Sequence, residues 1–166
     1  SKNNLDTVYK INKFIEDYGA RELINLSEAR INNRLSDLGS RIVNREEKIR
    51  RICIAGPSSS GKTSFSNRLL FELMARSLRP VRISMDNFYI PRGELKPGTD
   101  IESIDAIDLP FFNSVRNQLI RGEEVTLPVY DFKEGKRKTG KKIQLDEDQP
   151  IIIEGIHALN PLSTAS

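Results

Sequence analysis

The stretch 51-RICIAGPSSSGKTSFS-66 decides the fold of this chain. Its centre, residues 56–63, satisfies the pattern G-x-x-x-x-G-K-[ST] of a P-loop, in which a glycine-rich turn joins a buried strand to a helix. An apolar run, Ile52 to Ala55, precedes the pattern, and a segment with apolar residues at helical spacing follows it. The stretch therefore predicts a strand, a phosphate-binding loop and a helix, in that order.

The residue types in this loop suit the binding of a polyphosphate. Gly56 and Gly61 leave room for backbone N–H groups to approach the phosphates. Lys62 places a positive charge near the β and γ phosphates, and Thr63 offers a hydroxyl to Mg²⁺. We therefore expect ATP or GTP to bind with Mg²⁺, and the predicted nucleotide-binding residues are Gly56, Ser58, Ser59, Ser60, Gly61, Lys62, Thr63 and Ser64.

Composition and charge restrict the class of protein. With 166 residues, 37% of them hydrophobic and 30% charged, the chain can form one domain plus an appendage. The sequence has no apolar run near the ~18 residues of a membrane span and no visible signal peptide, and its one cysteine, Cys53, excludes a disulfide framework, so we expect a cytoplasmic protein. A net charge of +3, from 26 basic and 23 acidic residues, argues against nucleic-acid binding without excluding it, and homo-oligomerisation stays open.

The sequence pattern divides the chain into two parts. Residues 1–48 carry apolar residues at helical spacing, up to Gly19 and again from about Ser27, and are predicted to form a helical N-terminal segment or linker. Residues 49–166 are predicted to form an α/β P-loop domain, with a parallel sheet, flanking helices and a β-hairpin insertion. Its expected elements are strands 51–55, 81–85 and 151–155, a helix to about 78 that buries Phe65, Leu69, Leu73 and Met74, a helix over 109–122, and hairpin arms 124–132 and 139–145.

Two carboxylates stand at the ends of predicted strands. Asp86 follows the strand 81–85, and Glu154 ends the apolar run Ile151 to Ile153. Parallel sheets bind ligands at the carboxyl ends of their strands. Phosphoryl transfer needs a held metal and a group that deprotonates the acceptor hydroxyl. We therefore expect Asp86 to be the base and Glu154 to serve the metal, directly or through water.

Several motifs, taken in order, resemble those of the uridine kinase and phosphoribulokinase family of P-loop kinases. They are GPSSSGKT, MDNFY, DIESIDAID, LPVYDF and IIIEG, and they cover about residues 51–162. More narrowly, the chain is similar to uridine kinase-like proteins whose kinase domain follows a threonyl-tRNA-synthetase-like region, which would make residues 1–48 connecting helices. Family members continue past the IIIEG strand with an arginine-bearing lid and further strands, so the resemblance implies a catalytic unit that is incomplete at its C-terminal end.

The resemblance also implies roles for individual residues. Asp86 would be the base that faces the acceptor hydroxyl, with Phe88 and Tyr89 lining the pocket, and Glu154 would lie near Mg²⁺. Glu102 matches an acidic residue that holds the nucleoside ribose. The aromatic residues that contact the base fall on Tyr130 and Phe132.

Two departures from the family pattern concern the acceptor. Ile101 replaces an aromatic residue of the pyrimidine kinases, and Gly135 stands where those kinases have a histidine that reads the base. Recognition of uracil in particular therefore stays open, because a site that reads one base needs such polar partners. For His157, the only histidine, a structural hydrogen bond is favoured over contact with phosphates.

The leading functional hypothesis is ATP-dependent, Mg²⁺-assisted phosphoryl transfer to a hydroxyl of a nucleoside (uridine- or cytidine-like) or a related small molecule, with Lys62 and Asp86 as catalytic residues. One alternative keeps this machinery and takes a sugar phosphate as acceptor, as phosphoribulokinases do; Lys136, Arg137 and Lys138 would then contact its phosphate. They belong to a basic cluster, residues 133–142, for which a solvated hairpin turn is the simpler interpretation. The other alternative is a regulatory module that senses ATP or associates with RNA.

Overall fold

The computed structural model describes residues 20–46, 48–56 and 62–164. The chain forms two compact units, Ser1–Arg41 and Ile42–Ser166, each of which is described by itself. Helix α2, Ala20–Val43, accounts for the described part of the first unit and continues to the start of the second. It begins earlier than the predicted start near Ser27, while the first predicted helix lies outside the described residues. Among the described residues, none of the helices is long and apolar enough to cross a membrane.

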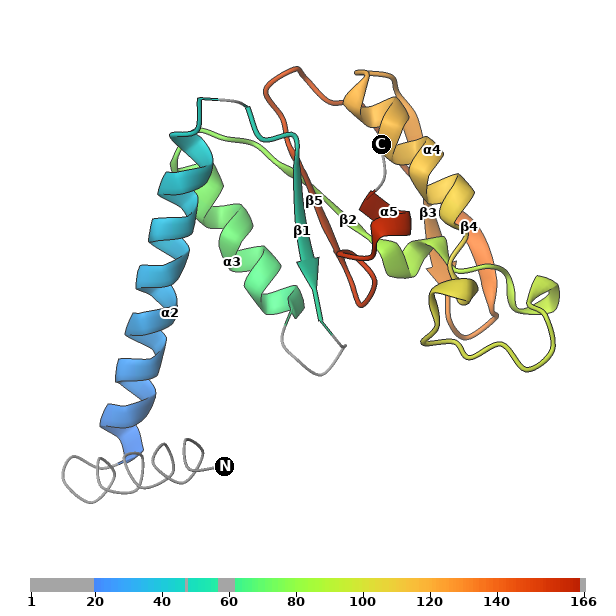
Figure 1. Ribbon diagram of the computed structural model, residues 1–166, viewed down its shortest axis with the longest axis horizontal. Helices are drawn as coiled ribbons and strands as arrows, with labels where there is room; N and C mark the ends of the chain where they lie inside the picture. The colour runs from blue at the N-terminus through green and yellow to red at the C-terminus, as the bar shows by residue number, and fades with distance from the viewer. Residues whose placement is uncertain (1–19, 47, 57–61, 165–166) are drawn as a thin grey trace. The chain divides into compact units, whose positions relative to one another are not determined.

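The second unit is built on a three-stranded parallel sheet with the strand order β1-β5-β2 (Figure 1). Its strands are β1 (Arg51–Ala55), β2 (Val81–Ser84) and β5 (Ile151–Gly155). The central strand β5 is buried along its whole length, as expected of a continuous apolar run in a parallel sheet. The register pairs Ala55 with Gly155 and Ser84 with Glu154, so all three strands end at the same edge.

Alternation along β5 directs its side chains to the two faces of the sheet. Ile151 and Ile153 belong to the main hydrophobic core, together with Phe112, Val115 and Leu119 of α4 (Leu109–Ile120). On the other face, Glu154 contacts Ser66 of α3 (Lys62–Ala75). Helices α3 and α4 therefore cover opposite faces, which Figure 1 shows, and the predicted parallel sheet with flanking helices is confirmed.

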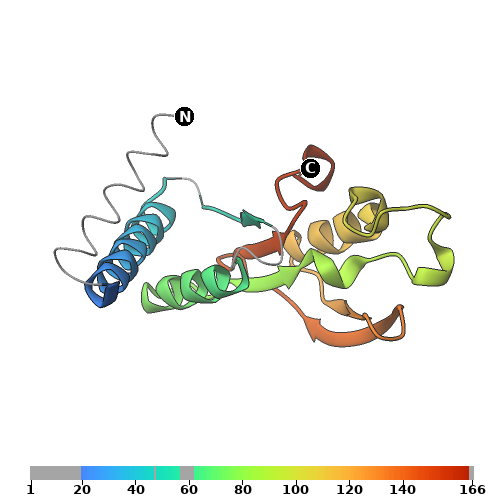
Figure 2. The ribbon, with the colours of Figure 1, turned by 90° about the horizontal axis from the view of Figure 1, so that it is seen from below.

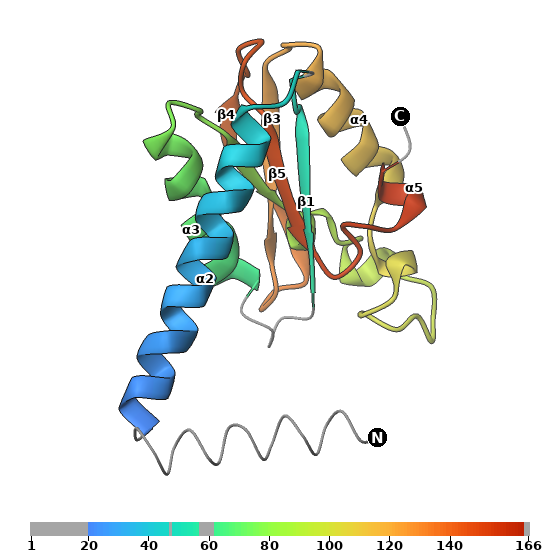
Figure 3. The ribbon, with the colours of Figure 1, turned by 60° about the vertical axis from the view of Figure 1, so that its left-hand side comes forward.

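The predicted hairpin is also present, as the two-stranded sheet of β3 (Val125–Asp131) and β4 (Lys136–Ile143). It lies beside the short 3₁₀ helix Met85–Phe88 that follows β2 (Figure 2). After β5, the four-residue helix α5 (Pro161–Thr164) lies next to α4, where the side chain of Asn113 donates a hydrogen bond to the carbonyl of Leu162 (Figure 3).

Some predicted element limits and one core residue are wrong. Helix α3 ends at Ala75 instead of about residue 78, because Ser77 adopts a left-handed φ of 65° and the chain turns before Pro80. Met74 is predicted to be buried but is 50% exposed, whereas Leu69 and Leu73 are fully buried. Phe88, expected to line the acceptor pocket, is 1% exposed and belongs to the hydrophobic core. Helix α4 ends at Ile120, β2 ends at Ser84, and the second hairpin arm begins at Lys136 instead of residue 139, inside the basic cluster.

Candidate active site

Glu154 lies at the edge where the three parallel strands end. Its side chain is only 6% exposed, and the Ser66 hydroxyl of α3 donates a hydrogen bond of 2.6 Å to its Oε2 atom. Arg82 of β2 extends over the same face and donates to Ser66 Oγ at 3.4 Å and to Asn67 Oδ1. A buried carboxylate with a hydroxyl donor is suited to face a cation, since its charge would otherwise be costly in this environment.

The loop between β1 and α3 starts beside this carboxylate. Ala55, the last residue of β1, pairs with Gly155, and Gly56 follows directly. Residues 57–61 and the side chains of Lys62 and Thr63 lie outside the described part of the chain, so the predicted contacts of Ser58, Ser59, Ser60, Gly61, Lys62 and Thr63 stay predictions. The backbone of α3 begins at Lys62, as the P-loop pattern predicts, and Ser64 is exposed.

This edge fits the magnesium ion that the P-loop pattern implies. The described residues contain no cluster of three or more metal-ligating side chains. Mg²⁺ in phosphoryl-transfer sites is held by one or two protein ligands together with substrate phosphates and water. Glu154, beside the start of the phosphate loop, is therefore suited to be the protein ligand of such a magnesium site.

Asp86 lies just beyond β2, in the 3₁₀ helix Met85–Phe88. Its backbone N–H donates to Ser84 Oγ at 3.3 Å, which caps this short helix, and its side chain is half-buried. Ser84 is the register partner of Glu154, and Asp86 comes two residues after Ser84. The structure thus places both predicted carboxylates at one edge of the sheet.

The three aromatic residues assigned to the acceptor come together in space. Tyr89 follows the 3₁₀ helix, while Tyr130 and Phe132 belong to the hairpin. The ring centroids are 5.5 Å apart for Tyr89 and Tyr130, 5.7 Å for Tyr89 and Phe132, and 5.0 Å for Tyr130 and Phe132. Tyr130 is buried, whereas Phe132 is 52% exposed, so this aromatic cluster offers one free face to a ligand.

The pKa of the Tyr89 phenol responds to the charges of two acidic residues. Burial is the largest cause that raises the pKa of the Tyr89 phenol, and the charges of Asp86 and Glu102 raise that pKa further. Glu102 is exposed, and its carbonyl accepts a 2.6 Å hydrogen bond from His157 Nε2, which must carry the proton because a carbonyl only accepts. This bond confirms the structural role favoured for His157.

Three polar side chains that sequence reasoning missed hold the backbone of the aromatic cluster. Asn87 Oδ1 accepts a hydrogen bond from the Tyr130 N–H (3.2 Å). The Arg137 guanidinium donates to the Tyr89 carbonyl (3.2 Å), and that of Arg92 donates to the Phe132 carbonyl (2.8 Å). Asn87 adjoins Asp86 in the MDNFY motif and could have been suspected, but no pattern along the sequence identifies the two arginines.

Two residues of the basic cluster make contacts within the domain. Arg137 also pairs with Asp108 (3.1 Å) and stacks on Phe111, and Lys138 pairs with Asp131 (2.7 Å). The other four basic residues are exposed, as expected of a solvated hairpin: Lys133, Lys136, Lys141 and Lys142.

Comparisons with known proteins agree with this geometry. Residues 51–162 match the family model described as phosphoribulokinase / uridine kinase family. The chain is 31% identical over 107 residues to uridine-cytidine kinase C of Dictyostelium discoideum, covering 64% of this chain and 23% of that protein. It is 31% identical over 113 residues to the uridine kinase of Lactobacillus helveticus, covering 65% and 52%. The chain thus spans about half or less of the length of these relatives.

A solved structure shares the fold. The structure of a possible uridine kinase from Bacillus stearothermophilus superposes with a TM-score of 0.69 at 22% identity, over 81% of this chain and 76% of that chain. At this identity the similarity concerns the fold alone, and it supports the assignment to a P-loop kinase fold.

Proposed function

This chain belongs to the phosphoribulokinase / uridine kinase family, and we propose that it transfers the γ-phosphoryl group of ATP, with Mg²⁺, to a hydroxyl of a nucleoside-like acceptor. The observation that carries the proposal is the common edge of β1, β5 and β2. There the phosphate loop begins, Glu154 is buried beside it, and Asp86 follows the neighbouring strand. This arrangement provides the two protein carboxylates that phosphoryl transfer to an alcohol requires.

Each residue has a proposed role in the reaction. The loop amides and Lys62 hold the ATP phosphates, and Thr63 and Glu154 would hold Mg²⁺, which supplies charge neutralisation when bound. The Asp86 carboxylate accepts the proton of the acceptor hydroxyl as its oxygen attacks the γ phosphorus. The bond from that phosphorus to the bridging oxygen breaks, and ADP leaves.

The acceptor site is proposed at Glu102 and the aromatic cluster. The charge of Glu102 acts on Tyr89, which supports placing a hydroxyl-binding carboxylate beside the aromatic rings. The exposed face of Phe132 can stack on a planar group such as a nucleobase. These two features favour a uridine- or cytidine-like nucleoside over a sugar phosphate. Of the three cations assigned to a sugar phosphate, Arg137 and Lys138 already have carboxylate partners, and Lys136 is exposed.

The proposal also covers the N-terminal segment and the location of the protein in the cell. Residues 1–48 would connect the kinase domain, residues 49–166, to a threonyl-tRNA-synthetase-like region, and the protein would act in the cytoplasm. These rest on the sequence patterns alone.

The proposal is tested by phosphoryl transfer from ATP to a panel of nucleosides and sugar phosphates, with Asp86→Asn as the variant. We expect the variant to lose about 10²–10⁴-fold in kcat for a nucleoside while still binding ATP, because only the base is removed. Transfer to sugar phosphates alone would favour the phosphoribulokinase-like alternative. ATP binding without transfer to any acceptor would support a regulatory module and contradict the proposed function.

A further inference from the structure

Arg92 spans the turn that joins the two hairpin strands. Its backbone N–H donates to the Gly135 carbonyl at 2.9 Å, and its guanidinium donates to the Phe132 carbonyl at 2.8 Å. One residue therefore bonds both ends of the segment 132–135. The turn is closed from within by the Gly135 N–H, which donates to the Asp131 carbonyl at 2.7 Å.

Gly135 is what allows Arg92 to lie across the turn. Its φ of +65° is a conformation that residues other than glycine rarely adopt. A Cβ atom at this position would come within 2.8 Å of Arg92 Cβ and 2.9 Å of Arg92 Cζ and Nε. A larger residue at position 135 is thus incompatible with the observed course of the Arg92 side chain.

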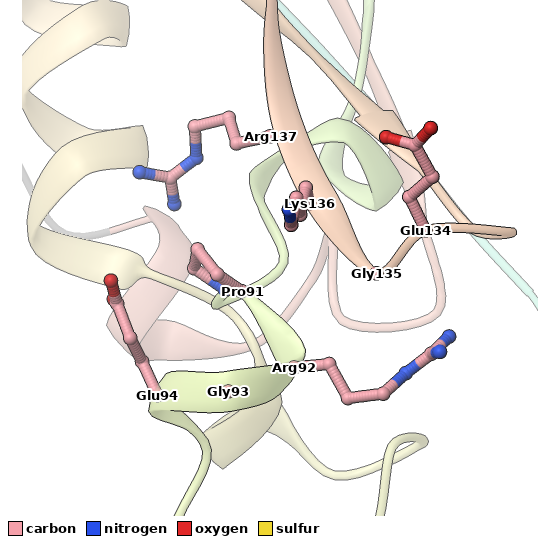
Figure 4. Close-up of a pocket in the computed structure, with 8 residues that line it drawn as sticks. All are labelled: Pro91, Arg92, Gly93, Glu94, Glu134, Gly135, Lys136 and Arg137. Atoms are coloured by element: carbon pink, nitrogen blue, oxygen red, sulfur yellow. The ribbon is translucent and has the colours of Figure 1, made fainter.

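The same contact acts on the aromatic cluster. Phe132 is 52% exposed, so burial alone does not fix its position, while its carbonyl is held by Arg92. On the other side of the cluster, Arg137 holds the Tyr89 carbonyl in the same way. Both arginines line an open pocket of about 630 Å³ between the segment 91–94 and the hairpin turn 134–137 (Figure 4).

We propose that Arg92 is a positioning residue for the acceptor: by bonding both ends of the turn, it fixes the ring of Phe132 where the acceptor stacks. This inference rests on the proposed function. Because Arg92 acts through the turn, Gly135 and Arg92 form one unit, and a change at either position should displace the same ring.

The test is steady-state kinetics of the full-length protein with three variants: Arg92→Ala, Gly135→Ala and Lys142→Ala. Lys142 is an exposed cation on β4, away from the turn, and serves as the matched control. We expect Arg92→Ala to raise the acceptor KM at least about tenfold, with the ATP KM changed less than about twofold. Gly135→Ala should also raise the acceptor KM, because its Cβ atom would displace the Arg92 side chain and a φ of +65° is strained for alanine.

Two results would overturn the inference: an unchanged acceptor KM in Arg92→Ala, or an acceptor KM raised equally in the Lys142→Ala control. A wild-type protein without transferase activity would instead contradict the proposed function. Amide hydrogen exchange tests separately whether Arg92 stabilises the turn: Arg92→Ala should speed exchange of the Gly135 N–H, which closes the turn on the Asp131 carbonyl, and an unchanged rate would disprove the role of Arg92.

Discussion

The Ser66 hydroxyl donates a 2.6 Å hydrogen bond to the buried carboxylate of Glu154, which joins helix α3 to the central strand β5. Replacing Ser66 by alanine removes this donor and leaves a carboxylate oxygen unsatisfied at a buried position. We expect Ser66→Ala to lower the free energy of unfolding by about 1–3 kcal/mol, measured by urea denaturation. Ser114→Ala on α4 is the control, because Ser114 is exposed and its hydroxyl accepts a hydrogen bond from Gln118, so its loss should cost less than about 0.5 kcal/mol. Equal stability of the two variants would show that the bond to Glu154 contributes nothing.

Phe88 and Phe132 are expected to differ in what they contribute: Phe88 to stability and Phe132 to acceptor binding. Phe88 is 1% exposed and packs on Phe111 and Phe112 at 5.4 and 5.1 Å, so Phe88→Ala should cost about 3–5 kcal/mol of stability. Phe132 is half-exposed, so Phe132→Ala should cost far less stability yet raise the acceptor KM. Denaturation curves and acceptor kinetics of both variants check this. Acceptor binding that survives Phe132→Ala would remove the ring from the proposed site.

The raised pKa of Tyr89 predicts that the protein loses stability at alkaline pH. Burial and the nearby carboxylates disfavour the phenolate, so the pKa of Tyr89 in the folded protein lies above the ordinary value of about 10. The neutral phenol therefore contributes stability that is present below pH ~10 and is lost as the pH rises through the higher folded pKa. In a spectrophotometric titration, the Tyr89→Phe variant should lack one phenol that ionises above pH ~10 in the wild-type protein. The assignment fails if the missing phenol ionises at or below that pH.

The sequence predicts the part of the site that depends on strand ends. The P-loop pattern and the apolar run before Glu154 each follow from local residue order, and parallel pairing brings them to one edge without further information. The motifs that resemble the family also anticipate that Tyr89 meets Tyr130 and Phe132, which belong to a distant segment of the chain.

The supports of the aromatic cluster could not be predicted in this way. Arg137 stands in a run of basic residues that indicates a solvated surface, yet its guanidinium contacts Asp108, Phe111 and the Tyr89 carbonyl. These partners become neighbours only after the hairpin packs beside the segment that follows β2. The extra length of β4 within the basic cluster has the same origin, because pairing with β3 overrides the weak strand preference of lysine and arginine.

Asp108 supports helix α4 and Arg137 with different oxygens. Its Oδ1 accepts the N–H of Phe111 at 3.2 Å as the N-cap, and its Oδ2 pairs with Arg137 at 3.1 Å. Asp108→Ala removes both contacts and should lower the free energy of unfolding by about 1–3 kcal/mol. Asp108→Asn keeps the capping oxygen and loses the negative charge, so its cost should stay below about 1 kcal/mol, since the pair is partly solvent-exposed. Urea denaturation measures both. If asparagine destabilises as much as alanine, the ion pair with Arg137, and not the cap, carries the effect, and Arg137→Gln should then reproduce the loss.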